Sequence, residues 1–194
     1  MKLNLLIIAI ALISCKLKPA PGHIITPGGE SFSQTDTSGV LVGNIKFELR
    51  ATKEEKETFE DGIVPWVNIN NPQKQLDSLV NADEIVINSP KATLIIDYPL
   101  THKAIFYIES PNGFSRKQLI LLISEKYHQI YKEEEDGATI KTIPVDERGD
   151  ELNRNKTNGK YGIWGHDITD LDLGSIDVRK GPNGEIFLEL DIES

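Results

Sequence analysis

The side chains best suited to chemistry lie close together near the C-terminus, between Trp164 and Asp172. His166 contributes an imidazole there, and Asp167, Asp170 and Asp172 follow it with carboxylates. Imidazole nitrogen and carboxylate oxygen together suit several divalent cations, and a histidine beside an aspartate can also transfer protons. We therefore take His166 and Asp167 as candidate catalytic residues, and His166, Asp167, Asp170 and Asp172 as candidate metal ligands.

A structural role for this stretch is the interpretation we favour, because its spacing matches no metal or catalytic motif. Trp164 would then belong to the core, His166 and Asp167 to a turn, and Asp170 and Asp172 to the solvated face of a strand. The sequence also has no phosphate-binding loop, dinucleotide fingerprint, His-Glu-x-x-His helix or Gly-x-Ser-x-Gly elbow. We predict no cofactor, with a divalent metal as the alternative.

Aromatic residues offer a second kind of candidate site. Tyr161 and Trp164 could bind a sugar or a peptide, although aromatic side chains at such spacings are more often part of a core. Asp97-Tyr98-Pro99 ends a predicted strand, where active sites often gather side chains. For that tripeptide we favour a turn role.

The clearest predicted element is a helix from about Phe114 to Glu135, and Ser115 with Gln118 makes a capping-box pattern at its start. Its apolar face comprises Leu119, Leu122, Ile123, Tyr127, Ile130 and Tyr131. The acidic run from Glu133 to Asp136 opposes the helix dipole, and we expect a hydrated last turn there. A shorter helix is predicted over residues 72–81, because Asn71 and Pro72 resemble a helix start.

The remaining apolar segments predict strands. The clearest are two C-terminal strands joined by the turn Pro182-Asn183-Gly184. Alternation switches parity at Gly174-Ser175, which predicts a β-bulge. Strands before and after one long helix predict an α+β fold, with a mostly antiparallel sheet and the helix on one face.

The polar stretch from Lys141 to Lys160 separates the long helix from these strands. Structureless segments of this length inside a domain are uncommon, and they are often either functional or disordered. We favour disorder.

Charge excludes one class of partner. The chain has 194 residues, 30 acidic and 21 basic, and a formal net charge of −9. An acidic surface without a basic stripe repels phosphate backbones, so we predict no nucleic-acid binding.

The single cysteine, Cys15, closes an apolar N-terminal segment. Lys2 precedes an almost wholly aliphatic run from Leu3 to Leu12, which is too short to span a bilayer and has the layout of a secretion signal. The last four residues, Leu12-Ile13-Ser14-Cys15, resemble the lipobox of bacterial lipoprotein precursors. The resemblance covers residues 1–15 only, and it implies cleavage before Cys15 and lipidation of its sulfur.

This resemblance implies an address in the bacterial cell envelope, with the membrane as a partner through Cys15. Lipoproteins of this class that stay at the inner membrane tend to have Asp at the position of Lys16, so Lys16 favours the outer membrane. It does not indicate whether the domain lies on the periplasmic or the outer face of that membrane. Residues 1–14 are then a signal peptide. Residues 15–39 are rich in Pro, Gly, Ser and Thr, which predicts a flexible tether, and residues 40–194 form a single α+β domain.

The expected function is a non-enzymatic binding module for a protein, peptide or glycan partner. The alternative is a metal-assisted or acid/base hydrolase of an envelope polymer, with His166, Asp167 and Asp170 as its candidate residues. A third possibility, an immunity-type lipoprotein that neutralises a basic toxin, has only the acidic charge in its favour.

Overall fold

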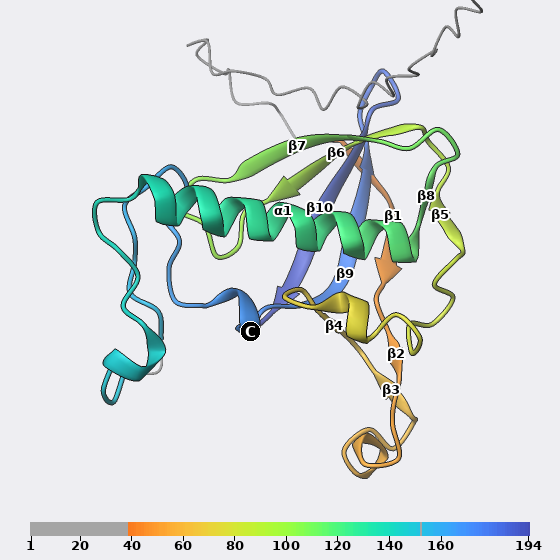
Figure 1. Cartoon of the computed structure of the whole chain (residues 1–194). Coiled ribbons are helices and arrows are strands. Elements are labelled where there is room, and N and C mark those ends of the chain that lie inside the picture. The colour runs from red at the N-terminus through yellow and green to blue at the C-terminus, as the bar shows by residue number, and fades with distance from the viewer. Residues whose placement is uncertain (1–38, 152) are drawn as a thin grey trace, which may run out of the picture. The chain divides into compact units, whose positions relative to one another are not determined.

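The computed structural model describes residues 39–151 and 153–194, so Cys15, the predicted signal and the tether up to residue 38 lie outside it. Its central sheet consists of β1 (Val40–Lys46), β4 (Val67–Asn68), β6 (Lys91–Ile96), β7 (Ala104–Glu109), β9 (Asp172–Lys180) and β10 (Ile186–Glu193). The strand order is β1-β9-β10-β6-β7, and β4 also pairs with β9 (Figure 1). The β10–β6 pair is parallel and the other pairs are antiparallel.

The structure also has two small antiparallel sheets outside the central one. They pair β2 (Leu49–Arg50) with β3 (Ile63–Val64), and β5 (Ile85–Ile87) with β8 (Phe114–Ser115). The helix α1 (Arg116–Gly137) lies across one face of the central sheet (Figure 1). The predicted α+β fold, mostly antiparallel with one long helix, is confirmed.

The start of α1 has the predicted cap. The Ser115 hydroxyl accepts the backbone N–H of Gln118 at 3.2 Å, and the Gln118 side chain accepts the backbone N–H of Ser115 at 2.9 Å. This capping box satisfies two donors that an α-helix leaves free at its first turn. Phe114 precedes it in β8 rather than in the helix.

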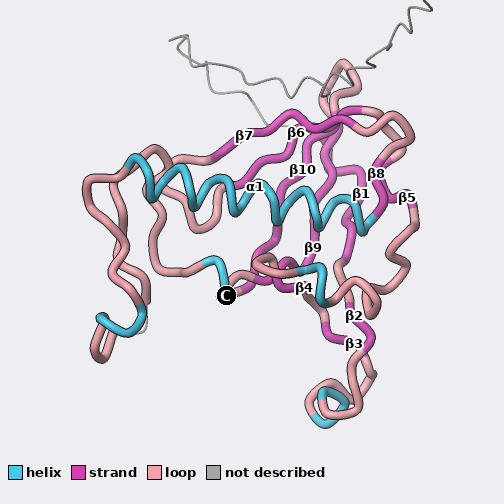
Figure 2. The backbone as a smooth tube through the Cα atoms, viewed as in Figure 1, coloured by secondary structure: helices cyan, strands magenta, loops and turns pink. Residues whose placement is uncertain are grey.

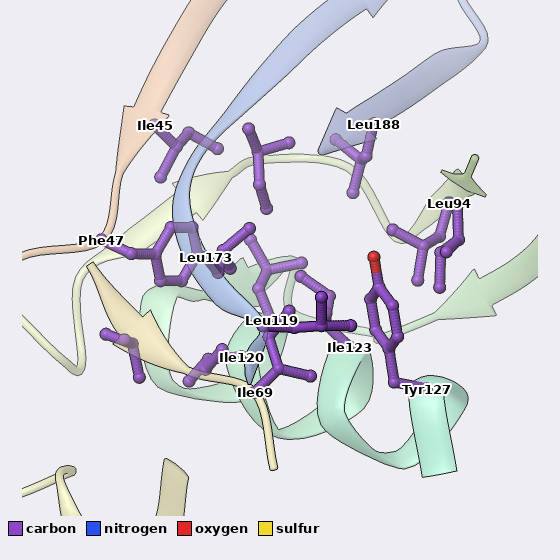
Figure 3. Packing of buried hydrophobic residues seen from close by; sticks show 14 of the residues in the cluster. Ile45, Phe47, Ile69, Leu94, Leu119, Ile120, Ile123, Tyr127, Leu173 and Leu188 are labelled. Atoms are coloured by element: carbon purple, nitrogen blue, oxygen red, sulfur yellow. The ribbon is translucent and has the colours of Figure 1, made fainter. Parts of the chain in front are cut away.

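The core lies between α1 and the central sheet. Figure 3 shows Leu119, Ile120, Ile123 and Tyr127 of α1 directed toward side chains of the strands. The sheet and its neighbouring segments contribute Ile45, Phe47, Ile69, Leu94, Leu173 and Leu188. Burial of each such side chain contributes about 1.5–3 kcal/mol, so this layer holds the helix in place.

The predicted β-bulge is also confirmed. Asp191 of β10 lies opposite Ser175, and Ile192 lies opposite Leu173, so Gly174 is the extra residue of β9. Because of the bulge, the apolar side chains before and after it point to the same face of the sheet, where Leu173, Ile176 and Val178 are buried.

The predicted α-helix over residues 72–81 is wrong. A single 3-10 turn, Pro72–Lys74, begins after Asn71, whose side chain makes no cap. The chain cannot continue as a helix because its backbone pairs with the segment around β2. Arg50 donates its N–H to the Ser78 carbonyl at 2.8 Å, and Val80 donates to the Glu48 carbonyl at 2.9 Å.

The segment between α1 and β9 is largely loop, interrupted by the 3-10 helices Val145–Glu147 and Ile168–Asp170 (Figure 2). Among the residues that the structure describes, no helix combines the length and apolar character needed to cross a bilayer.

Candidate functional site

A buried carboxylate at the end of α1 anchors the loop that carries the candidate residues. Glu134 has no exposed surface. One of its carboxylate oxygens accepts the Thr157 hydroxyl at 2.6 Å and the Gly159 N–H at 2.8 Å, and the other accepts the Tyr161 N–H at 2.8 Å. Burial raises the pKa of Glu134, but these bonds and one from the Gly162 N–H outweigh burial and lower its pKa. The expected hydrated last turn is therefore wrong at Glu134.

Two glycines let the chain wrap around this carboxylate. A Cβ atom on Gly159 would lie 2.7 Å from a Glu134 oxygen. Gly162 has a φ of +61°, in the left-handed region that side chains disfavour. Glycine at these positions allows the backbone N–H groups to close on Glu134.

Tyr161 supports the loop from inside. Only 4% of Tyr161 is exposed, and its hydroxyl donates to the Glu133 carboxylate at 2.7 Å. Lys160 bonds the same carboxylate at 2.9 Å, and its ammonium lies 4.7 Å from the centroid of the Tyr161 ring. Partial burial raises the pKa of Glu133, yet hydrogen bonds from Gln129, Lys160 and Tyr161 lower it to about 2. The structure thus places Tyr161 beneath the surface, and its ring is not presented to a ligand.

Asp167 forms the second anchor of this loop. Its carboxylate accepts a bidentate pair of bonds from Arg148, at 2.7 and 3.0 Å, and a nitrogen of Arg154 lies 3.7 Å away. Both arginine side chains are almost fully buried, at 3% and 6% exposed, and Arg148 also donates to the Ile143 carbonyl at 2.8 Å. The predicted disorder of residues 141–160 is wrong where these arginines, and Thr157 at Glu134, tie the segment to the fold.

Three ring side chains form what we call the aromatic platform: Tyr98, Trp164 and His166. Trp164 is 39% exposed and packs edge to face on Tyr98, with ring centroids 5.3 Å apart. The His166 ring lies 5.6 Å from that of Tyr98 and 6.2 Å from that of Trp164. The platform is thus a small aromatic cluster that presents the indole to solvent.

Core tyrosines fix the backbone of the platform. Tyr127 and Tyr131, both on α1, donate their hydroxyls to the carbonyls of Tyr98 and His166, at 2.8 and 2.9 Å. The backbone N–H of Trp164 also donates to the Pro99 carbonyl at 3.1 Å. These bonds join the end of β6, the helix and the loop before β9 at one place. Three hydrogen bonds therefore hold the backbone of the platform residues in place.

The other two acids of the sequence cluster are engaged locally. Asp170 accepts the backbone N–H of Asp167 at 2.9 Å, and Asp172 accepts the side-chain amide of Asn68 at 2.9 Å. Burial raises the pKa of Asp172, Asn68 lowers it, and the charge of Asp170 raises it, with a net rise. Within residues 39–151 and 153–194, no group of three or more His, Cys, Asp or Glu side chains is placed to hold a metal ion.

The structure thus separates the residues that the sequence places together. His166 lies with Trp164 in the platform, Asp167 faces the two arginines, and Tyr161 lies under the loop. Sequence reasoning missed Arg148, Arg154 and Glu134, while Tyr98 carried a signal through its position at a strand end. Aromatic faces of this kind suit the apolar face of a sugar ring or the side chain of a peptide.

Comparison with family models, with curated proteins and with solved structures gave no match to this chain.

Proposed function

We propose that this chain is a lipid-anchored protein of the bacterial cell envelope, and that its folded domain is a non-enzymatic binding module. The anchor would be Cys15, which lies outside the described residues, so this part of the proposal depends on the lipobox-like sequence. The partner class is a peptide or glycan of the envelope. The aromatic platform is its contact surface.

The observation that carries this proposal is the combination of an exposed indole and a fixed frame. Trp164 is 39% exposed, whereas Tyr127 and Glu134 beneath the loop have no exposed surface. A rigid aromatic side chain loses little conformational entropy on binding, and tryptophan and tyrosine are the residue types most enriched at binding hot spots. The platform has the exposure and the support that such a contact requires.

The contacts of Asp167 favour binding over hydrolysis. A general base needs a carboxylate lone pair directed at the proton that it abstracts. Each oxygen of Asp167 accepts a hydrogen bond from Arg148, and the Asp167 side chain is only 21% exposed, so a substrate has little access to the remaining lone pairs. Asp167 therefore ties the segment that carries Arg148 and Arg154 to the chain just before β9, and His166 packs against aromatic rings.

A capture experiment tests the binding proposal. The purified full-length protein, in detergent, is used to recover partners from an envelope extract, next to Trp164→Ala and Leu41→Ala. Leu41 is also an exposed apolar residue, at 50%, but it lies on β1. We expect the wild type and Leu41→Ala to recover the same partner and Trp164→Ala to lose it. Equal recovery by all three proteins would contradict the proposal.

A separate experiment tests the anchor. Cys15→Ser should move the protein from the membrane fraction, because the lipid attachment atom is lost. A variant that still fractionates with membranes would contradict the anchor and leave the platform untouched.

A further inference from the structure

One edge of the central sheet is open to strand addition. β7 ends the strand order, so its outer edge has no strand partner in the described part of the chain. It pairs with β6 over six residues without a register shift. The opposite edge strand, β1, has a register shift between Leu41 and Gly43. Because bulges discourage edge-to-edge pairing, β1 is protected and β7 is not.

The hydrogen-bond alternation shows which groups of β7 face outward. Ser110 donates its N–H to the Pro90 carbonyl at 2.9 Å, one residue beyond the paired strands. In an antiparallel pair the hydrogen-bonded positions recur every two residues, so Ile108 and Phe106 direct their backbone groups toward β6. Ile105 and Tyr107 therefore present their N–H and C=O groups at the free edge.

We propose that β7 pairs antiparallel with β7 of a second copy of this chain, about a two-fold axis at Phe106. This register makes Phe106 a non-hydrogen-bonded pair with itself. Tyr107 then lies opposite Ile105 of the second copy, and Lys103 lies opposite Glu109. The outward groups of Ile105 and Tyr107 meet one another, as the alternation requires.

The side chains suit this register on the face away from α1. Tyr107 is 71% exposed and Ile105 is 36% exposed, so each copy offers an aromatic residue to a β-branched one. At the ends of the strand the opposite charges of Lys103 and Glu109 meet. Glu109 also pairs with Lys91 at 2.9 Å within its own chain, so basic and acidic residues alternate across the junction.

Charge selects this register over the next one. A shift by two residues that centred the pairing on Tyr107 would keep the backbone bonds, but it would place Glu109 opposite Ile105. Both charged side chains would then lose their partners in the second copy. Only the register centred on Phe106 gives two matched charge pairs, because the two-fold axis repeats the contact.

A disulfide cross-link tests the register directly. In a non-hydrogen-bonded pair the Cα atoms lie about 4.5 Å apart, within the range of about 4.4–6.8 Å that a disulfide spans. Full-length chains carrying Phe106→Cys or Leu41→Cys are expressed in bacterial cells, oxidised and run on a non-reducing gel beside the unaltered chain. We expect a reducible band of doubled mass for Phe106→Cys alone.

A second pair of variants covers the case in which Phe106→Cys misfolds. Tyr107 and Ile105 are exposed, so cysteine at either position leaves the core intact. Copies carrying Tyr107→Cys and copies carrying Ile105→Cys, distinguished by tags, should cross-link to each other when co-expressed. Each variant expressed alone should give far less cross-linking, because the cysteines of two identical copies are diagonal neighbours and do not lie opposite each other.

Charge reversal provides a further test, in which the cysteine positions stay the same and only the charges change. In the tagged cysteine pair, Lys103→Glu in both copies turns two attractive pairs into repulsive ones and should lower cross-linking roughly tenfold. Glu109→Lys in both copies should do the same. A mixture of one Lys103→Glu copy and one Glu109→Lys copy restores both attractions and should restore the band.

Two results would overturn the proposal. The first is the absence of a doubled-mass band both from Phe106→Cys and from the mixture of Tyr107→Cys and Ile105→Cys copies. The second is a cross-linked band at a mass other than double, which would show that a different protein pairs with β7.

Discussion

The Thr157 hydroxyl lies 2.6 Å from a carboxylate oxygen of Glu134, in a part of the protein that solvent does not reach. This contact joins the last turn of α1 to the loop that leads to Trp164. Backbone N–H groups of the same loop complete the set of donors around the carboxylate. The platform therefore depends on a charge that the fold buries and satisfies.

Glu134→Gln should strongly destabilise the protein. An amide group replaces one acceptor oxygen by an N–H donor, which then faces backbone donors. A buried donor without a partner costs about 1–3 kcal/mol, and lost bonds to a charged group cost about 1.5–3 kcal/mol. We expect the free energy of unfolding, measured in urea, to fall by about 2–4 kcal/mol. The exposed Glu135→Gln should stay within about 0.5 kcal/mol of wild type, and equal effects would contradict this role of Glu134.

Stability should fall in acid for the same reason. The folded-state pKa values of Glu134 and Glu133 lie below their ordinary value of 4.5, and that of Glu133 is lowered to about 2. Their contribution is complete above pH 4.5 and is lost as the pH falls toward 2. Asp172, whose pKa is raised, acts in the opposite sense. Unfolding in urea from pH 6 to pH 2 should show the loss, and a flat profile would argue against it.

Gly159→Ala should disturb the same loop. The new Cβ would approach a Glu134 oxygen to 2.7 Å, which neither group can relieve without breaking a hydrogen bond. We expect a loss of about 1–3 kcal/mol in the free energy of unfolding. Gly43→Ala is the matched control, because a Cβ there meets nothing within 4 Å. Similar losses in the two variants would show that the close approach at Gly159 has no effect.

Divalent cations should not stabilise the fold. Asp167 is bonded to Arg148, and Asp172 to Asn68, so binding a metal would first break these contacts. We expect the thermal midpoint to be the same with calcium, magnesium, manganese or zinc as with a chelator. A rise that His166→Ala abolishes would instead support the metal-assisted hydrolase.

The parts of the fold that were predictable are those that local chemistry determines. Ser115 and Gln118 are three residues apart, and the parity switch around Gly174 can be read within one strand. The prediction of a helix over residues 72–81 failed because this segment pairs with Glu48 and Arg50, which are far away in sequence.

The platform was only half predictable for the same reason. Trp164 and His166 are neighbours in the sequence, but Tyr98 reaches them only through the fold. Arg148 and Asp167 are 19 residues apart, and no local sequence pattern predicts their pairing. Glu134 belongs to an acidic run that resembles a solvated helix end, and only tertiary structure separates it from its neighbours.

The most direct test of the proposed binding module is the fluorescence of Trp164 itself. A Trp66→Phe variant leaves Trp164 as the only indole and keeps an aromatic ring against Phe59. Titration with the captured partner should shift its emission in a saturable way, and the same partner should bind Trp164→Ala far more weakly. A partner that binds the variant tightly without changing this emission would contradict the account.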